Sequence, residues 1–386
     1  LNTTGGGTIN FDQTGDQSLK VTTASTGAGT ITINNAGGSG ADIAVGSISN
    51  TGTVVVNAAG AIDDVGDDSA SPATDITASS VDLDAGKGIG ATWALETQVS
   101  SLEANASAGG VRVDNTGALQ IGGVVGTLSG VDATGDIALS STAGITVIEA
   151  ITTGGTYEVR LSAFNGVTQS GADGDITSGT GGVLINADSN DDGTGGFLSD
   201  DIGALITSSG DVTITAADTD LTGSVNAGGI VSFNSTNNIN VTLGNIDLST
   251  FDLSTFDLTD VELDLVTAAS LIKIASGSGA IELRGDIGPD HVGSLQLVTD
   301  TTIDSSGQAN TITGATLDLD AGTGIGDTFA LGIAATTISG ATSAGDIAIA
   351  TAATAGTVDA SLNTTGGGTI NFDQTGDQSL KVTTAS

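Results

Sequence analysis

The stretch Leu1–Ser25 reads LNTTGGGTINFDQTGDQSLKVTTAS, and Leu362–Ser386 repeat it letter for letter. A 25-residue identity at an offset of 361 is typical of a window cut from a tandem array of 361-residue units. We therefore predict that residues 1–361 form one repeat unit and that residues 362–386 begin the next identical unit. A recent duplication inside a free-standing protein is the alternative. Because neither a start methionine nor a signal peptide precedes Leu1, we expect an interior piece of a longer protein.

Within the unit one short pattern recurs: a glycine, a small or polar residue, and then two β-branched or aliphatic residues separated by one position. This alternation has the period of a half-buried strand, and the glycine supplies the turn before it. Several intervals are 22 or 23 residues or small multiples of these, such as 46 and 66. The pattern begins at Gly7, Gly29, Gly52, Gly109, Gly135, Gly181, Gly210, Gly228, Gly279, Gly345 and Gly368.

Short strands at a fixed period predict a parallel β-solenoid. One turn cannot bury its own apolar face, whereas stacked turns give every strand a hydrogen-bonded neighbour on both sides. Central strands of this kind do not tolerate proline, and the only 2 prolines, Pro72 and Pro289, lie in stretches that we expect to be loops. We predict an all-β, right-handed parallel β-helix with about 16 rungs per unit and less than about one-tenth helix.

A longer echo links Val81–Leu95 (VDLDAGKGIGATWAL) with Leu317–Leu331 (LDLDAGTGIGDTFAL), which agree at eleven of fifteen positions. No helical pattern follows their closely spaced glycines, so we interpret these as turn glycines and not as a phosphate-binding loop. With the following Leu95–Gly123, the echo resembles repeat regions of large bacterial exoproteins of the filamentous haemagglutinin type. That resemblance implies a right-handed parallel β-helix exported by two-partner secretion.

From Ile246 to Leu265 the sequence consists of four consecutive fives, IDLST FDLST FDLTD VELDL. This stretch resembles the pentapeptide-repeat family, whose right-handed β-helix uses one five for each side of a four-sided turn. The resemblance implies one locally square turn. The alternative is a duplicated loop. The third position of each five is leucine: Leu248, Leu253, Leu258 and Leu263.

The charge balance is 7 Lys and Arg against 45 Asp and Glu, a formal net charge of −38. Such a chain repels nucleic acid and anionic lipid and attracts cations, although the acids also fit a purely solvating coat. There is no cysteine, which excludes disulfides and thiolate metal sites, and no apolar run of about 18 residues that could span a membrane. We expect an extracellular location at the cell surface.

One candidate metal site consists of Asp188, Asn190 and Asp192, followed by Gly193. Oxygen ligands at alternate positions and a glycine at the sharp turn make up the first half of a calcium loop, so calcium is the candidate cofactor. The twelfth position is Ser199 and not the usual glutamate. A solvated turn is the alternative. A second, weaker candidate is the acidic cluster of Asp63, Asp64, Asp67 and Asp68.

Parallel β-helices also carry polysaccharide-processing enzymes, which need paired carboxylates or a cleft of basic and aromatic residues. Asp82 with Asp84, and Asp318 with Asp320, place two carboxylates on one strand face, but an outward polar ladder explains them as well. We assign no catalytic residue. His291, Trp93 and Tyr157 each occur once, and the distinct basic positions look widely scattered: Lys20, Lys87, Arg112, Arg160, Lys273 and Arg284.

These observations favour a structural extracellular repeat protein that forms a filament, stalk or sheath by continuous stacking of solenoid units. The stalk of a giant bacterial adhesin, with its binding tip elsewhere, is the alternative. A polysaccharide-processing β-helix enzyme comes third. The expected partners are the chain itself, end to end along the fibre, together with divalent cations or other cell-surface polymers. We expect neither a nucleic-acid partner nor a membrane-spanning segment.

Overall fold

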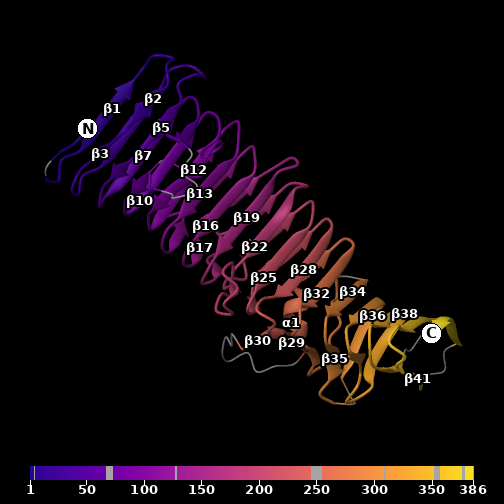
Figure 1. Ribbon diagram of the computed structural model, residues 1–386. Helices are drawn as coiled ribbons and strands as arrows, with labels where there is room; N and C mark the ends of the chain where they lie inside the picture. Colours follow the sequence, from indigo (N-terminus) through magenta and orange to yellow (C-terminus); the bar gives the residue numbers. More distant parts are fainter. Residues whose placement is uncertain are drawn as a thin grey trace. The chain divides into compact units, whose positions relative to one another are not determined.

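The structure is a computed structural model that describes residues 1–3, 5–66, 73–126, 128–244, 254–291, 293–307, 310–351, 357–375 and 379–385. The chain is an all-β, right-handed parallel β-solenoid of about 16 turns with 1% helix, so the predicted fold class is confirmed (Figure 1). It divides into two compact units. The first unit contains Leu1–Asn190 and Ser199–Gly210, and the second contains Asp191–Leu198 and Asp211–Ser386.

The strands of the first unit are β1 (Ile9–Gln13), β2 (Leu19–Val21), β3 (Ala24–Ser25), β4 (Ile31–Asn35), β5 (Ile43–Val45), β6 (Ile48–Ser49), β7 (Thr53–Ala58), β8 (Ile62–Asp64), β9 (Ile76–Thr77), β10 (Ser80–Ala85), β11 (Leu95–Gln98), β12 (Ser101–Ala106), β13 (Val111–Asn115), β14 (Leu119–Ile121), β15 (Val131–Ala133), β16 (Ile137–Ser141), β17 (Ile145–Val147), β18 (Ile151–Thr153), β19 (Glu158–Ala163), β20 (Val167–Gln169), β21 (Ile176–Ser178), β22 (Gly182–Asn186) and β24 (Leu205–Ser208).

The chain passes from one unit to the other at β23 (Phe197–Ser199), and the elements of the second unit are β25 (Val212–Ala216), β26 (Thr219–Leu221), β27 (Ser224–Ala227), β28 (Ile230–Ser235), β29 (Asn240–Leu243), β30 (Thr255–Leu258), α1 (Asp260–Asp264), β31 (Val266–Ala268), β32 (Leu271–Ser276), β33 (Ile281–Leu283), β34 (Ser294–Thr299), β35 (Thr302–Ser305), β36 (Thr311–Ala321), β37 (Gly324–Ile325), β38 (Leu331–Thr342), β39 (Ile347–Thr351), β40 (Thr357–Thr364), β41 (Ile370–Gln374) and β42 (Ser379–Ala385).

The core is made of columns of inward-facing aliphatic side chains. In the first unit, one column runs through the first positions of successive parallel strands β1, β4, β7, β10 and β12, paired in register. Because neighbouring strands are one strand spacing apart, each side chain packs directly against the equivalent one in the next turn. All five residues of this column are buried: Ile9, Ile31, Val54, Val81 and Leu102.

The glycine-led pattern begins the longest strand of each turn, but this long side changes face within the first unit. Up to β12 the long strands are β1, β4, β7, β10 and β12. The next strand, β13, continues two earlier series at once: Val111 bridges Ile89, and Val113 pairs with Leu95. From there the long side runs through β13, β16, β19 and β22.

The second unit contains the same change of face, and it follows the second copy of the fifteen-residue echo. Ile347 of β39 pairs with Ile325 of β37, while Ile349 of β39 pairs with Leu331 of β38. These pairings match those of Val111 and Val113 position for position. The echo that begins at Val81 and at Leu317 is therefore a module that joins two short sides into one long side.

One glycine explains why the module needs its sequence. Gly90 and Gly326 both have a positive φ, of 62° and 70°, which side-chain-bearing residues rarely adopt. An added Cβ would lie 2.2 Å from the carbonyl oxygen of Arg112 or of Ala348 in the next turn. The prediction of turn glycines is confirmed at these two positions.

The fives resembling pentapeptide repeats lie partly outside the described residues, including Leu248 and Leu253. Of the two fives that are described, the third contributes to β30 and the fourth forms the short helix α1. The prediction that each five forms one side of a square turn is therefore wrong for the fourth. A capping box explains the helix, since the side chain of Thr259 accepts from the backbone N–H of Glu262, and Glu262 accepts from that of Thr259.

We predict that Gly90→Ala lowers the free energy of unfolding by about 2–4 kcal/mol, because the new Cβ combines left-handed backbone strain with a clash in the next turn. Gly15→Ala is the matched control, since a Cβ there meets nothing within 4 Å. The control should change stability by less than about 0.5 kcal/mol. Urea unfolding followed by circular dichroism measures both variants, and equal stability of the two would contradict the module's proposed constraint.

Candidate functional site

A groove of about 830 Å³ lies in the first unit, at the starts of β13, β16 and β19. Its floor includes Gly109, Gly110 and Gly135. Because these residues carry no side chain, the backbone itself forms the bottom of the hollow. Charged and aromatic side chains line the walls, and we call the hollow the arginine groove: Arg112, Asp136, Tyr157, Glu158 and Arg160.

The strand register determines the spacing of the two arginines. Arg112 pairs with Ala138 in the next turn, and Ala138 pairs with Arg160 in the turn after that. All three residues alternate with buried neighbours and so face outward. The two arginine positions are therefore about 9.5 Å apart, twice the strand spacing. The small side chain of Ala138 leaves space between them.

Polar contacts fix one wall of the arginine groove. Nη2 of Arg160 lies 2.7 Å from Oε1 of Glu158, and both side chains are partly exposed. The backbone N–H of Glu158 donates to Oδ1 of Asp136 at 2.9 Å. Tyr157 is 41% exposed at the start of this wall. An arginine has five N–H donors, so Arg160 retains donor capacity beyond this exposed ion pair.

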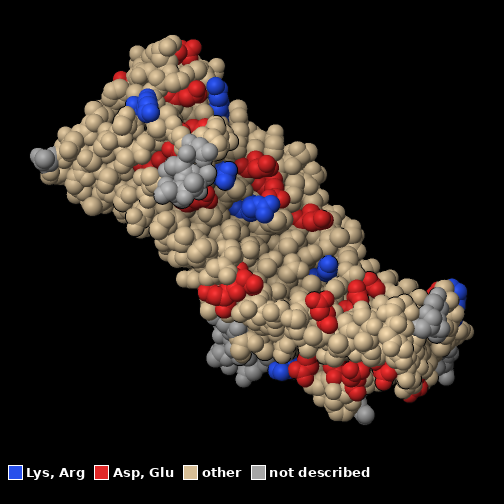
Figure 2. All heavy atoms as spheres, viewed as in Figure 1, with Lys and Arg blue, Asp and Glu red and all other residues tan. Residues whose placement is uncertain are grey.

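The sequence interpretation missed this grouping, because it treated the basic positions as widely scattered. That description is wrong for Arg112 and Arg160, which the parallel register places on one face. Their separation of 48 residues, about two turns of the repeat, was the signal available in the sequence. On the face drawn in Figure 2, the few basic side chains lie close to acidic ones and form no continuous basic surface.

The predicted calcium loop falls where the chain passes from one unit to the other. Asp188 is buried in the first unit, and its backbone N–H donates to Oδ1 of Asn186 at 3.3 Å. In the second unit, Oδ1 of Asp192 accepts from the backbone N–H of Thr194 at 2.9 Å. Among the described residues, no group of three or more acidic or histidine side chains is placed to hold a metal ion. Calcium binding by Asp188, Asn190 and Asp192 stays a prediction.

The second acidic cluster has a structural role where it is described. Oδ1 of Asp63 accepts from the backbone N–H groups of Thr92 and Trp93 at 3.2 and 3.3 Å. Asp304 makes the same contacts with the second echo. Asp63 therefore fixes the loop of the face-changing module. Asp67 and Asp68 lie outside the described residues.

The paired carboxylates on strand faces form hydrogen bonds between turns. Oδ1 of Asp84 accepts from Nδ2 of Asn105 at 2.8 Å, and Oδ2 of Asp318 accepts from Nε2 of Gln296 at 2.7 Å. Asp82 differs, since it is only 3% exposed beside the 1% exposed Glu103 of the next turn. Burial, followed by the charges of Glu149 and Asp82, raises the pKa of Glu103.

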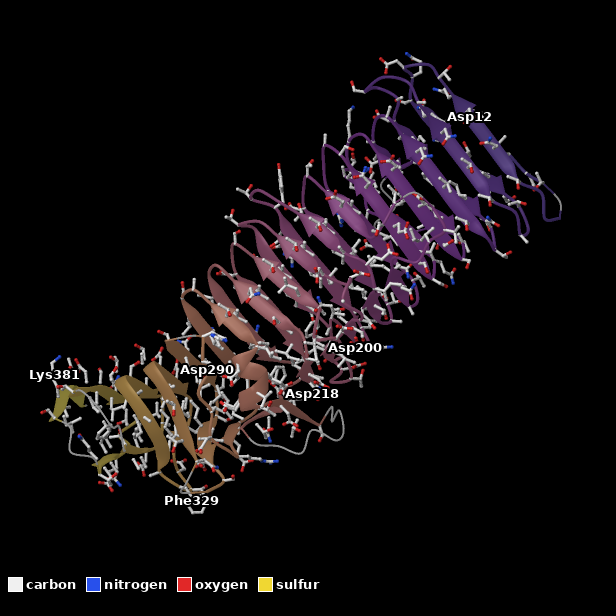
Figure 3. All side chains as sticks on the ribbon, turned by 180° about the vertical axis from the view of Figure 1, so that it is seen from behind. Asp12, Asp200, Asp218, Asp290, Phe329 and Lys381 are labelled. Atoms are coloured by element: carbon white, nitrogen blue, oxygen red, sulfur yellow. The ribbon has the colours of Figure 1, made fainter. Side chains whose placement is uncertain are left out.

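Two other buried carboxyl groups have strongly raised pKa values. Burial, together with the negative charges of Asp64 and Glu96, raises the pKa of Asp75 to about 9, against the opposing effect of the N–H of Glu96. In the second unit burial raises the pKa of Asp218 to about 7 (Figure 3). Asp218 still accepts from the backbone N–H of Thr219 at 2.8 Å. The sequence interpretation did not identify these groups.

His291 is exposed in a turn, as is its neighbour Asp290, whose N–H donates to Oδ1 of Asp264 at 3.0 Å. No helix in the described part of the chain has the length and apolarity needed to cross a bilayer. Compared with known protein families, curated proteins and solved structures, the chain matches none. The functional argument therefore depends on the chain's own geometry.

We predict that the protein is more stable at pH 5 than at pH 8. Asp75 has a pKa of 3.8 when unfolded and about 9 when folded, so the folded state retains a proton that the unfolded state has lost. This contribution is complete below about pH 4 and disappears as the pH rises through about 9. Thermal unfolding across this range measures it.

Asp75→Asn isolates this effect from the overall charge, because an amide keeps the hydrogen-bond acceptor without ionising. The variant should have a higher Tm than the wild type at pH 8 and a weaker dependence of Tm on pH. A variant destabilised equally at pH 5 and pH 8 would show that Asp75 is ionised in the folded protein.

Proposed function

We propose that the chain is a segment of a structural extracellular repeat protein, in which β-solenoid units stack continuously into a filament, stalk or sheath at the cell surface. The proposal assigns the chain a mechanical role and gives no residue a catalytic one. Its support comes from the strand pairings of the two identical copies, each considered within its own unit.

The two copies show opposite sides of the same strand. β1 and β41 have identical sequences and bounds 361 residues apart. β1 pairs with the following strand β4, which places Ile9 against Ile31. β41 pairs with the preceding strand β39, which places Ile370 against Ile347. The sequence INFDQ therefore accepts an in-register parallel neighbour on either side, as an interior rung of a continuous array requires. This observation carries the proposal.

Side chains at the two copies are compatible with such a rung. Nζ of Lys381 lies 2.6 Å from Oδ2 of Asp359 in the preceding strand. Lys20, its counterpart in the first copy, pairs with Ala44 in the following strand. Asp12 lies on the outer surface of β1 and Lys381 on that of β42 (Figure 3). In the array one lysine would have an aspartate on one side and a small residue on the other.

The same charges disfavour direct pairing of two separate copies of this rung. Such pairing would place Lys20 on Lys381 and Asp12 on Asp373, about one strand spacing apart. Like charges directly opposite one another destabilise a sheet. The seam therefore favours the covalent continuation of one unit into the next over the docking of separate chains.

A stalk of a giant adhesin uses the same stacking and is the second candidate function. The arginine groove is the observation that favours it, because a side-wall binding site has no purpose in a purely mechanical filament. A polysaccharide-processing enzyme is the third candidate, and its requirement for basic and aromatic residues in a cleft is met in part by the same groove.

We predict that amide hydrogen exchange in Ile370–Gln374 slows when a further unit follows it. The experiment compares the 386-residue chain with a chain in which the 361-residue unit is written twice before the closing copy. A new hydrogen-bonded neighbour on the open side should increase protection at the first junction at least about tenfold.

The internal strand β16 is the control, since its neighbours are the same in both chains. Unchanged protection in the first junction strand, with normal protection in β16, would mean that the units do not stack continuously. Electron microscopy should also show an unbroken rod of about twice the length, and a flexible joint between units would contradict the proposal.

We also predict that calcium raises the Tm at low ionic strength more than sodium chloride of equal ionic strength does, because divalent cations relieve repulsion in a chain of net charge −38. Asp192→Asn should reduce the difference if the loop at Asp188–Gly193 takes part. An unchanged Tm after chelation would refute this stabilising role.

A further inference from the structure

We propose that the arginine groove binds an acidic saccharide, in which sugar hydroxyls alternate with carboxylate or sulfate groups. The groove goes beyond the stacking role, because none of its outward-facing side chains takes part in the core or in the seam between units. Its components match the parts of such a ligand: planar cationic forks, hydroxyl acceptors and one exposed aromatic ring.

The arginines provide the anion-binding element. Guanidinium groups bind carboxylate and sulfate oxygens through paired N–H donors. Arg112 and Arg160 lie two turns apart in one outward row, about 9.5 Å from each other by strand spacing. This spacing is comparable with the length of a disaccharide. The row can therefore hold two acidic groups of one chain, with the neutral part of the sugar above Ala138.

The remaining side chains suit the neutral part of the ligand. Tyr157 is 41% exposed and offers a ring face to the C–H surface of a sugar. The carboxylates of Asp136 and Glu158 and the hydroxyl of Thr134 line the same groove and accept hydrogen bonds from sugar hydroxyls. A ligand that offers only anionic groups would be repelled by these two carboxylates.

The second face-changing module shows that the arginines are not needed for the fold. Gly326 packs on the carbonyl oxygen of Ala348 as Gly90 packs on that of Arg112, so Ala348 occupies the position of the first arginine. Ala348 pairs with Asn371 where Arg112 pairs with Ala138. The same backbone arrangement therefore forms without Arg112.

The overall charge narrows the class of ligand. The net charge of −38 opposes polymers with a charge on every residue, such as nucleic acid, over any long contact. A saccharide with acidic groups at intervals meets the two arginines without requiring a continuous basic surface. The groove thus selects for sparse charge together with abundant hydroxyl groups.

The test measures binding of three tetrasaccharides to the 386-residue chain by isothermal titration calorimetry at low salt. Oligogalacturonate carries carboxylates, a heparin-derived fragment carries mainly sulfates, and cellotetraose is neutral. We expect both acidic probes to bind and the neutral one to bind at least about tenfold more weakly. A preference between the acidic probes identifies the anionic group, and equal binding supports recognition of their shared oxyanion chemistry.

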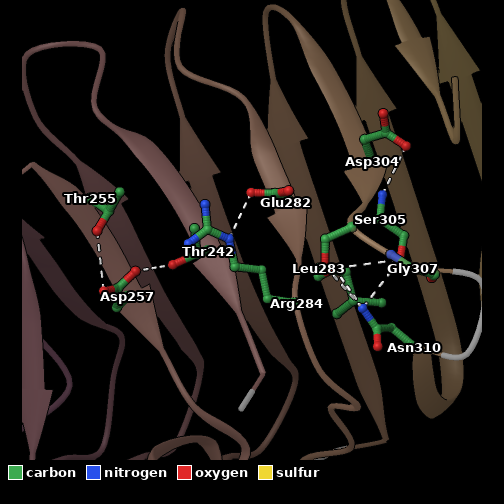
Figure 4. A network of polar contacts seen from close by, with 11 residues as sticks. Thr242, Thr255, Asp257, Glu282, Leu283, Arg284, Asp304, Ser305, Gly307 and Asn310 are labelled. Carbon is green, nitrogen blue, oxygen red and sulfur yellow. Dashed lines mark hydrogen bonds and ion pairs between the residues drawn. The ribbon is translucent and has the colours of Figure 1, made fainter. Parts of the chain in front are cut away.

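Arg112→Gln and Arg160→Gln should each weaken binding of the acidic probes at least about tenfold. Arg284→Gln is the matched control, because Nε of Arg284 lies 2.8 Å from Oε2 of Glu282 in the same Glu-x-Arg arrangement in the second unit (Figure 4). This control should bind like the wild type. Circular dichroism checks that all three variants fold.

Three results would overturn the proposal. The first is no binding of either acidic probe at millimolar concentration. The second is equal binding of cellotetraose, which would show that the arginines do not select the ligand. The third is an equal loss of affinity in Arg284→Gln, which would reduce the effect to the chain's overall charge.

Discussion

Every strand of this protein depends on a parallel, in-register partner in the adjacent turn. A single turn leaves its backbone N–H and C=O groups unpaired on both edges and exposes its aliphatic side chains, so the turn has no stable structure alone. Stacking satisfies both needs together, and the buried column from Ile9 to Leu102 is the direct result. Register therefore controls the position of every outward side chain, including the two arginines of the groove.

The sequence predicted strands well because one local rule, a glycine followed by alternating apolar residues, was sufficient. It identified the longest strand of each turn but not the face on which that strand lies. The interval of 57 residues between Gly52 and Gly109, which is no multiple of 22 or 23, marks the change of face at β12 and β13. Alternation alone distinguishes inside from outside, whereas the cross-section depends on pairings between distant turns.

The candidate sites were less predictable for the same reason. Outward polar residues all look alike in the sequence, so Asp75 could not be distinguished from a solvated aspartate before the structure showed its burial. Asp63 was interpreted as a cation ligand, yet its partners are backbone N–H groups of a loop about 30 residues later. Arg112 and Arg160 could have been associated only by someone who already knew the turn length between them.

The identical text at the two copies has a consequence for how such a protein changes over generations. Recombination between identical stretches of a gene adds or removes whole units, and each product contains the same seam as before. In the proposed array a gain or loss of one unit therefore creates no new interface that selection must repair. The reach of the molecule can vary in whole-unit steps, while the packing of every rung is inherited unchanged.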